Sequence, residues 1–143
     1  EQVPVADPGN LHDADTPEDY KTLLKIHNSQ LVRPVVTVSL AREKPFFDSR
    51  IAMLLSLVEE TGSVRSACQR MQLSYSSGWN MIKTLESQLN RPLIIRSKGG
   101  AKGGQSSLTD DGRDFLYRYN SYVNEVRELA NELYAKHFGG VFP

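Results

Sequence analysis

The chain of 143 residues has a single cysteine, Cys68, so it cannot form an internal disulfide. This is usual in proteins of the reducing cytosol. No apolar run approaches the ~20 residues that cross a bilayer, and the acidic N-terminus does not have the pattern of a signal peptide. Cys68 and the three histidines are scattered, without the spacing of a zinc site. We therefore expect a cytoplasmic protein of one domain's length, with no membrane partner, no metal and no cofactor.

The motifs of the common enzyme classes are also missing. There is no Gly-x-Ser-x-Gly, no His-Glu-x-x-His and no pair of acids beside an obvious nucleophile. The glycine-rich stretch 99–104 is not a Walker phosphate loop, because Gln105 stands where that loop needs lysine. It contains the GXXG pattern of KH domains, but that loop joins helices and this stretch joins expected strands. We expect a binding protein and not an enzyme.

The net charge of the whole chain is zero, but the basic residues gather in its middle part. Seventeen Lys and Arg balance seventeen Asp and Glu. Residues 1–31 carry a net charge of −4, residues 32–104 a net charge of +6, and residues 105–143 a net charge of −2. A basic central segment in a neutral chain indicates a polyanionic partner for that segment.

The first half of the chain shows four patterns. Residues 1–15 have no period and are expected to be a flexible lead-in. Thr16 and Pro17 are a helix start, which predicts a short helix over about 17–28. Val36, Val38 and Leu40 then alternate with polar residues, as in a strand. From Asp48 the apolar spacing becomes helical and stops at Gly62, a helix-ending signal.

The second half predicts three more helices and a hairpin. Ser63 caps a short helix whose inward face holds Cys68 as a small core residue, and Ser74 caps the next one. The stretches LIIRSK and SSLT flank the glycine-rich tip and predict a β-hairpin. Thr109 caps a long helix that reaches about Phe138, and its apolar stripe runs from Phe115 to Tyr134.

The expected elements follow the order of a winged helix-turn-helix domain, which is strand, helix, helix, short turn, helix and hairpin. The predicted fold is therefore mainly α with a small β wing, followed by a long C-terminal dimerisation helix. The expected organisation is an N-terminal extension at 1–31, the winged helix-turn-helix domain at 32–108, and a dimerisation helix with a tail at 109–143.

The segment TGSVRSACQRMQLSYSSGWNMIKTLE resembles the helix-turn-helix of the molybdate-responsive regulator family (ModE). The matching positions are Gly62, Ser63, Ala67, Ser74, Tyr75, Trp79, Ile82, the glycines of 99–104 and Leu108-Thr109-x-x-Gly112. The LysR-type regulators are similar over the same span, but usually lack the leading strand and the glycine-rich wing. The resemblance covers about residues 33–137 and implies a sequence-specific DNA-binding transcriptional regulator. Because a ModE protein continues into molybdate-binding domains where this chain stops at Pro143, we do not expect molybdate as a ligand.

The element order assigns double-stranded DNA contacts to the recognition helix, the helix caps and the wing. Asn80 has the amide that pairs with adenine, and Lys83 can reach guanine or a phosphate. Small serines at the start of the helix permit close approach to the groove. The full set of candidate DNA-binding residues is Ser63, Arg65, Ser74, Tyr75, Ser76, Ser77, Asn80, Lys83, Lys98 and Lys102.

Several side chains keep two interpretations at this stage. Tyr75 either touches a base or sugar or packs in the core, and Trp79 is assigned to core packing. Arg96 either contacts the DNA backbone or braces the wing through an internal ion pair. Arg42 and Lys44, with Arg33 and Arg50, are interpreted as ordinary surface charge.

The apolar stripe of the last helix predicts a homodimer through residues 109–137, because the rest of the chain offers too little surface to cover it. The alternative is a winged-helix interaction module that binds a protein and not DNA. Salt dependence separates the two, since DNA binding weakens linearly in log salt.

Overall fold

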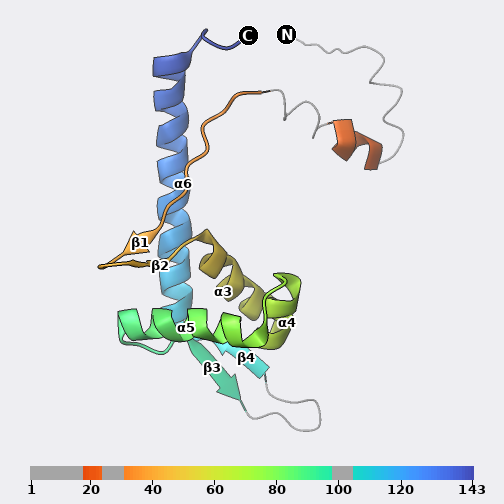
Figure 1. Ribbon diagram of the computed structural model, residues 1–143, viewed down its shortest axis with the longest axis vertical. Helices are drawn as coiled ribbons and strands as arrows, with labels where there is room; N and C mark the ends of the chain where they lie inside the picture. The colour runs from red at the N-terminus through yellow and green to blue at the C-terminus, as the bar shows by residue number, and fades with distance from the viewer. Residues whose placement is uncertain (1–17, 24–30, 98–104) are drawn as a thin grey trace. The chain divides into compact units, whose positions relative to one another are not determined.

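A computed structural model describes residues 18–23, 31–97 and 105–143 (Figure 1). The chain divides into two compact units. The first is Val35–Ala130; the second combines Glu1–Pro34 with Asn131–Pro143. The long helix α6, Asp110–Phe138, contributes to both.

Three helices begin where the caps predict, and the first also ends where its glycine predicts. Helix α3 covers Ser49–Thr61, with the Asp48 carboxylate accepting from two main-chain N–H groups at its start. It ends at Gly62, whose φ of 73° is the left-handed conformation that glycine adopts without strain. Helix α4 covers Val64–Arg70 and helix α5 covers Tyr75–Leu89. Their N-caps are Ser63 and Ser74, as expected.

The wing is an antiparallel pair of strands, β3 (Ile94–Ser97) and β4 (Gln105–Leu108). Ile94 pairs with Leu108, so both ends of the hairpin base enter the core. The tip at 98–104 lies outside the described residues. Helix α6 then starts after Thr109, whose hydroxyl accepts from the Gly112 N–H at 2.9 Å. The predicted hairpin and long helix are confirmed.

The strand predicted around Val36 was mostly wrong. Only Leu40–Ala41 forms a strand, β1, which pairs with β2 at Pro45–Phe47. The expected alternation survives in burial, since Val36 and Val38 are half-buried between exposed neighbours. The chain before β1 lies along α6 instead of a partner strand, and the Tyr119 hydroxyl donates to the Val38 carbonyl at 2.7 Å (Figure 1). The alternation of apolar residues therefore predicted which side of this segment is buried, but not that α6 buries it.

The core of the first unit lies where α3, α4, α5 and both hairpins meet α6. Phe47 from β2 is 1% exposed and packs edge-on against the rings of Phe115 and Tyr119, with centroids 4.8 and 4.7 Å away. Five aliphatic side chains of α3 and α5 are fully buried, which are Leu54, Leu55, Val58, Ile82 and Leu85. Phe47 therefore joins the β1–β2 hairpin to the first half of α6.

The second unit contains a helical segment at 18–23 and the last turns of α6. The predicted helix over 17–28 is confirmed for 18–23, and the remainder lies outside the described residues. The Tyr134 hydroxyl donates to the Val32 carbonyl at 3.1 Å. The rings of Tyr134 and Phe138 stack with centroids 5.5 Å apart. Across 18–23, 31–97 and 105–143, no helix is long and apolar enough to cross a membrane.

The contact between α4 and α5 requires a residue without a side chain at 78. A Cβ placed on Gly78 would lie 2.2 Å from Cys68 Sγ but 3.8 Å from Cys68 Cβ. The collision is therefore with the sulfur atom and not with the α4 backbone. The sulfur atom of Cys68 and the missing Cβ of Gly78 thus form one matched pair.

We predict that Gly78→Ala destabilises the domain by ~1–3 kcal/mol, as over-packing does, even though alanine favours helix by about 1 kcal/mol. Adding Cys68→Ala removes the clashing sulfur and should restore most of that loss. Urea unfolding of the two single variants and the double variant measures this coupling. Strictly additive effects would show that Cys68 is not the obstacle.

Candidate nucleic-acid interface

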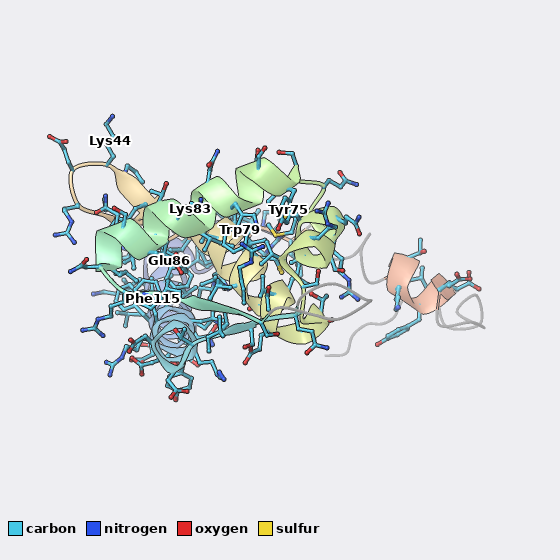
Figure 2. All side chains as sticks on the ribbon, turned by 90° about the horizontal axis from the view of Figure 1, so that it is seen from below. Lys44, Tyr75, Trp79, Lys83, Glu86 and Phe115 are labelled. Atoms are coloured by element: carbon cyan, nitrogen blue, oxygen red, sulfur yellow. The ribbon has the colours of Figure 1, made fainter. Side chains whose placement is uncertain are left out.

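Helix α5 presents a polar face to solvent. That face carries four of the residues predicted to contact DNA, which are Ser76, Ser77, Asn80 and Lys83. The opposite face is buried in the core through Gly78, Ile82 and Leu85. Lys83 is exposed one helical turn after Trp79, and both are labelled on α5 in Figure 2. Within the described part of the chain, the Lys83 ammonium has no ion pair or hydrogen bond.

The serines at the starts of α4 and α5 are occupied by their own helices. The Ser63 hydroxyl oxygen accepts from the Ser66 N–H at 3.0 Å. The Ser74 hydroxyl accepts from the Ser77 N–H at 3.1 Å and donates to the Ser77 hydroxyl at 2.8 Å. What remains to attract an anion at the start of α5 is its free main-chain N–H groups and the helix dipole.

Arg65, Tyr75, Trp79 and Arg96 form a stack that we call the aromatic ladder. The Arg65 guanidinium lies 4.3 Å from the centre of the Tyr75 ring. The Tyr75 and Trp79 rings meet edge to face at 6.3 Å, and the Arg96 guanidinium lies 4.8 Å from the Trp79 ring. Each cation–ring contact is worth roughly 0.5–2 kcal/mol, depending on how dry it is. The ladder links α4, α5 and β3.

The ladder shows how Tyr75, Trp79 and Arg96 are packed. Tyr75 and Trp79 are both half-buried and packed against the core, so the core assignment of Trp79 is confirmed. Arg96 braces the wing, but through an indole ring and not through an ion pair. Arg65 and Arg96 remain exposed at the same time. Their outer N–H groups are therefore available to a phosphate while their planes rest on rings.

Two glutamates hold the base of the wing. Glu86 of α5 accepts from the N–H groups of Leu93 and Ile94 at 2.7 and 3.2 Å. Glu59 of α3 accepts from the Leu108 N–H at 3.0 Å and pairs with Arg113 at 3.2 Å. Each strand of the wing is thereby attached to a different helix. The sequence analysis missed both roles, because the partners are main-chain groups that a side-chain pattern does not show.

The exposed cations fall into two groups. Four arginines pair with carboxylates, namely Arg70 with Glu60, Arg91 with Asp111, Arg113 with Glu59 and Arg118 with Asp114. Lys44 and Lys83 have no such partner among residues 18–23, 31–97 and 105–143. The other two candidate lysines, Lys98 and Lys102, lie outside the described residues. Unpaired cations therefore lie on α5 and beside it, although Arg33, Arg50, Arg127 and Lys136 also have no ion pair in the described ranges.

Cys68 is a core residue, as predicted. It is 1% exposed, and burial raises the pKa of its thiol, with nearby Arg65 opposing the shift to a smaller extent. A thiol that is buried and protonated is a poor nucleophile. Across the described ranges, no group of three or more His, Cys, Asp or Glu is placed to hold a metal ion.

A buried helical pair, an exposed polar recognition helix and a hairpin fixed beside it define a winged helix-turn-helix domain. Comparison with known families agrees, since residues 51–113 match the bacterial regulatory helix-turn-helix protein, LysR family. This span contains α3, α4, α5 and the wing. The winged helix-turn-helix fold that the sequence predicts is confirmed.

Curated relatives narrow the similarity to the ModE group. The chain is 37% identical over 93 residues to the molybdenum transport protein ModE of Azotobacter vinelandii, covering 60% of this chain and 34% of that protein. It is 31% identical over 75 residues to the transcriptional regulator ModE of Haemophilus influenzae, covering 52% and 29%. It is 29% identical over 79 residues to the DNA-binding transcriptional dual regulator ModE of Escherichia coli K12, covering 55% and 30%. The chain thus carries a ModE-like helix-turn-helix domain and spans about a third of the length of these relatives.

We predict that Glu86→Ala lowers the free energy of unfolding by ~1–3 kcal/mol, because two main-chain N–H groups at the wing base lose their acceptor. Glu86→Gln keeps one carbonyl oxygen and should cost less than half as much. Glu125→Ala, on the exposed surface of α6, is the matched control and should be neutral. Chemical denaturation of the three variants compares them. Equal losses for alanine and glutamine would mean that the charge, and not the hydrogen bonds, holds the wing.

Proposed function

We propose that this chain is the DNA-binding part of a sequence-specific transcriptional regulator. The observation that carries the proposal is the exposed polar face of α5, on a domain that matches a DNA-binding family. An α-helix fits the major groove, and serines at its first turns allow close approach to the base edges. In this arrangement Ser76, Ser77 and Asn80 enter the groove and Lys83 follows at its wall. This role is one of binding, not catalysis, and places the protein with the chromosome in the cytoplasm.

The flanking candidates are assigned to the phosphate backbone. Arg65 holds its guanidinium on Tyr75 at the edge of the recognition helix, where its outer N–H groups can meet a phosphate. The helix starts at Ser63 and Ser74 add main-chain N–H groups. Lys98 and Lys102 complete the set from the wing. Residues 32–108 therefore form the DNA-binding domain of the proposal, and residues 1–31 remain an extension without an assigned role.

The proposed regulator acts as a homodimer through residues 109–137. Helix α6 carries apolar side chains at 122, 126, 129 and 133, a spacing of four, three and four that keeps them on one face. Three of them are largely exposed, namely Tyr122 at 56%, Leu129 at 57% and Leu133 at 48%. Pairing two such helices would cover this face. It would also present two recognition helices to half-sites about one turn of DNA apart, or a multiple of it.

The names of the relatives refer to molybdenum and to transcription, and those properties belong to the relatives. The matched part of the A. vinelandii protein is 34% of its length. The proposal for this chain is therefore limited to DNA binding and dimerisation, and it includes no effector.

We predict that Asn80→Ala weakens binding to the preferred operator by ~1–3 kcal/mol and binding to random duplex by much less. The operator is first obtained by selection from random duplexes. Fluorescence anisotropy at fixed salt then gives both affinities. Asn120→Ala, an exposed asparagine on α6, is the matched control and should change neither. An equal loss on operator and random DNA would remove Asn80 from base recognition.

We predict a dimer at micromolar concentration that Leu129→Glu converts to a monomer, because it places a charge in the apolar face. Asn124→Glu adds the same charge at an exposed position on the other side of α6 and should leave the dimer intact. Sedimentation equilibrium measures both. A wild-type monomer, or dissociation by both variants alike, would contradict a dimer interface at this face.

A further inference from the structure

We infer that the β1–β2 hairpin is a second phosphate-binding element, which uses Lys44 beside the C-terminal end of α5. The inference rests on the proposed DNA-binding function and adds a contact at the end of the recognition helix opposite to Arg65. From the sequence, Lys44 and Arg42 were interpreted as ordinary surface charge. Three features of the structure give them a defined position and a defined partner.

The first feature is a fixed attachment of the hairpin to α5. The Arg42 Nε donates to Gln88 Oε1 at 3.0 Å, and its Nη2 donates to the Gln88 main-chain carbonyl at 3.0 Å. Gln88 belongs to the last turn of α5. On strand β2, Phe47 is 1% exposed in the core. The hairpin is therefore held at its turn through Arg42 and at β2 through Phe47.

The second feature is the direction of Lys44. Figure 2 shows Lys44 in the turn of this hairpin, on the side of α5 away from Trp79 and Phe115. Lys83 lies one helical turn after Trp79 and therefore nearer the opposite edge of α5. By helical spacing, exposed Asn80 lies between the Lys83 edge of α5 and the Gln88 edge to which the hairpin is attached. A duplex placed against α5 therefore approaches the tip of the hairpin as well.

The third feature is charge that nothing in the described structure neutralises. Lys44 is exposed and has no ion pair within 18–23, 31–97 and 105–143. Arg42 donates its hydrogen bonds to the neutral side-chain amide and the main-chain carbonyl of Gln88. No carboxylate therefore neutralises its positive charge through these bonds. The negative charge of Glu43 offsets one of these two positive charges in the local sum. The hairpin is left with a net positive tip, whereas Arg70, Arg91, Arg113 and Arg118 are ion-paired.

Helix α5 is longer than the major groove is wide, which places the hairpin tip near the DNA backbone. Its 15 residues span roughly 22 Å at 1.5 Å per residue. The major groove is about 12 Å wide. When the N-terminal half of α5 reads base edges, its C-terminal end has left the groove and lies at the sugar–phosphate wall. Lys44, attached to that end through Arg42, then meets the backbone.

The test is the salt dependence of DNA binding by the whole chain. Loss of one phosphate contact lowers the slope of log affinity against log salt by about 0.9. We therefore expect Lys44→Ala to lower the slope by that amount on operator and random duplex alike. The advantage of wild type over the variant then shrinks about 3.5-fold when salt rises from 50 to 200 mM. Lys44→Arg keeps the cation and should keep the slope.

Lys21→Ala removes the same charge from an exposed position in the helical segment 18–23 and serves as the control. It should leave the slope unchanged. Thermal melting checks that all variants fold, which is expected because the Lys44 side chain makes no polar contact in the described structure.

The outcomes separate this inference from the proposed function. If wild type binds no DNA with a salt-dependent affinity, the proposed function fails, and the hairpin contact fails with it. If wild type binds but Lys44→Ala keeps the full slope, only the hairpin contact is overturned. If Lys21→Ala and Lys44→Ala lower the slope equally, the effect is one of net charge, and the hairpin contact is again overturned.

Discussion

The wing depends on two carboxylates that accept hydrogen bonds from its main chain. Glu86 receives the N–H groups at the start of β3, and Glu59 receives the N–H group at the end of β4. A two-stranded hairpin alone is marginal in water, so the wing takes its direction from the helices that carry these glutamates. The Arg96–Trp79 contact adds a third attachment along β3. Wing and recognition helix are therefore positioned as one body.

The same body offers its polar and basic groups on one side. The core uses the aliphatic faces of α3, α4 and α5, and close packing of α4 on α5 needs Gly78 against Cys68. What remains on the solvent side of α5 is small, polar or cationic. A neutral chain thus has a local surface suited to a polyanion, since most of its exposed acids lie elsewhere or are already paired.

The sequence predicted the helices and the wing because their signals are local. Asp48, Ser63 and Ser74 cap helices through N–H groups two or three residues away, and Gly62 ends one through its own φ. The β1–β2 hairpin was missed because its strands have two and three residues with a register shift, and its turn lacks glycine. The same holds for Arg42 with Gln88 and Glu59 with Leu108, whose partners are 46 and 49 residues apart. Sequence periodicity identified the exposed face of α5, but long-range hydrogen bonds decide what stands beside it.

Phe47 has a mechanical role that follows from its neighbours. Its ring packs the β1–β2 hairpin against Phe115 and Tyr119 of α6, while Arg42 in the turn of the same hairpin is attached to the last turn of α5. One phenyl ring therefore lies in the connection between the helix proposed to read DNA and the helix proposed to pair with a second copy. In a dimer, a change in the distance between these two helices would be doubled by symmetry. In the proposed dimer, the spacing between half-sites would thus be partly fixed by the thickness of an aromatic ring that touches neither the DNA nor the second copy.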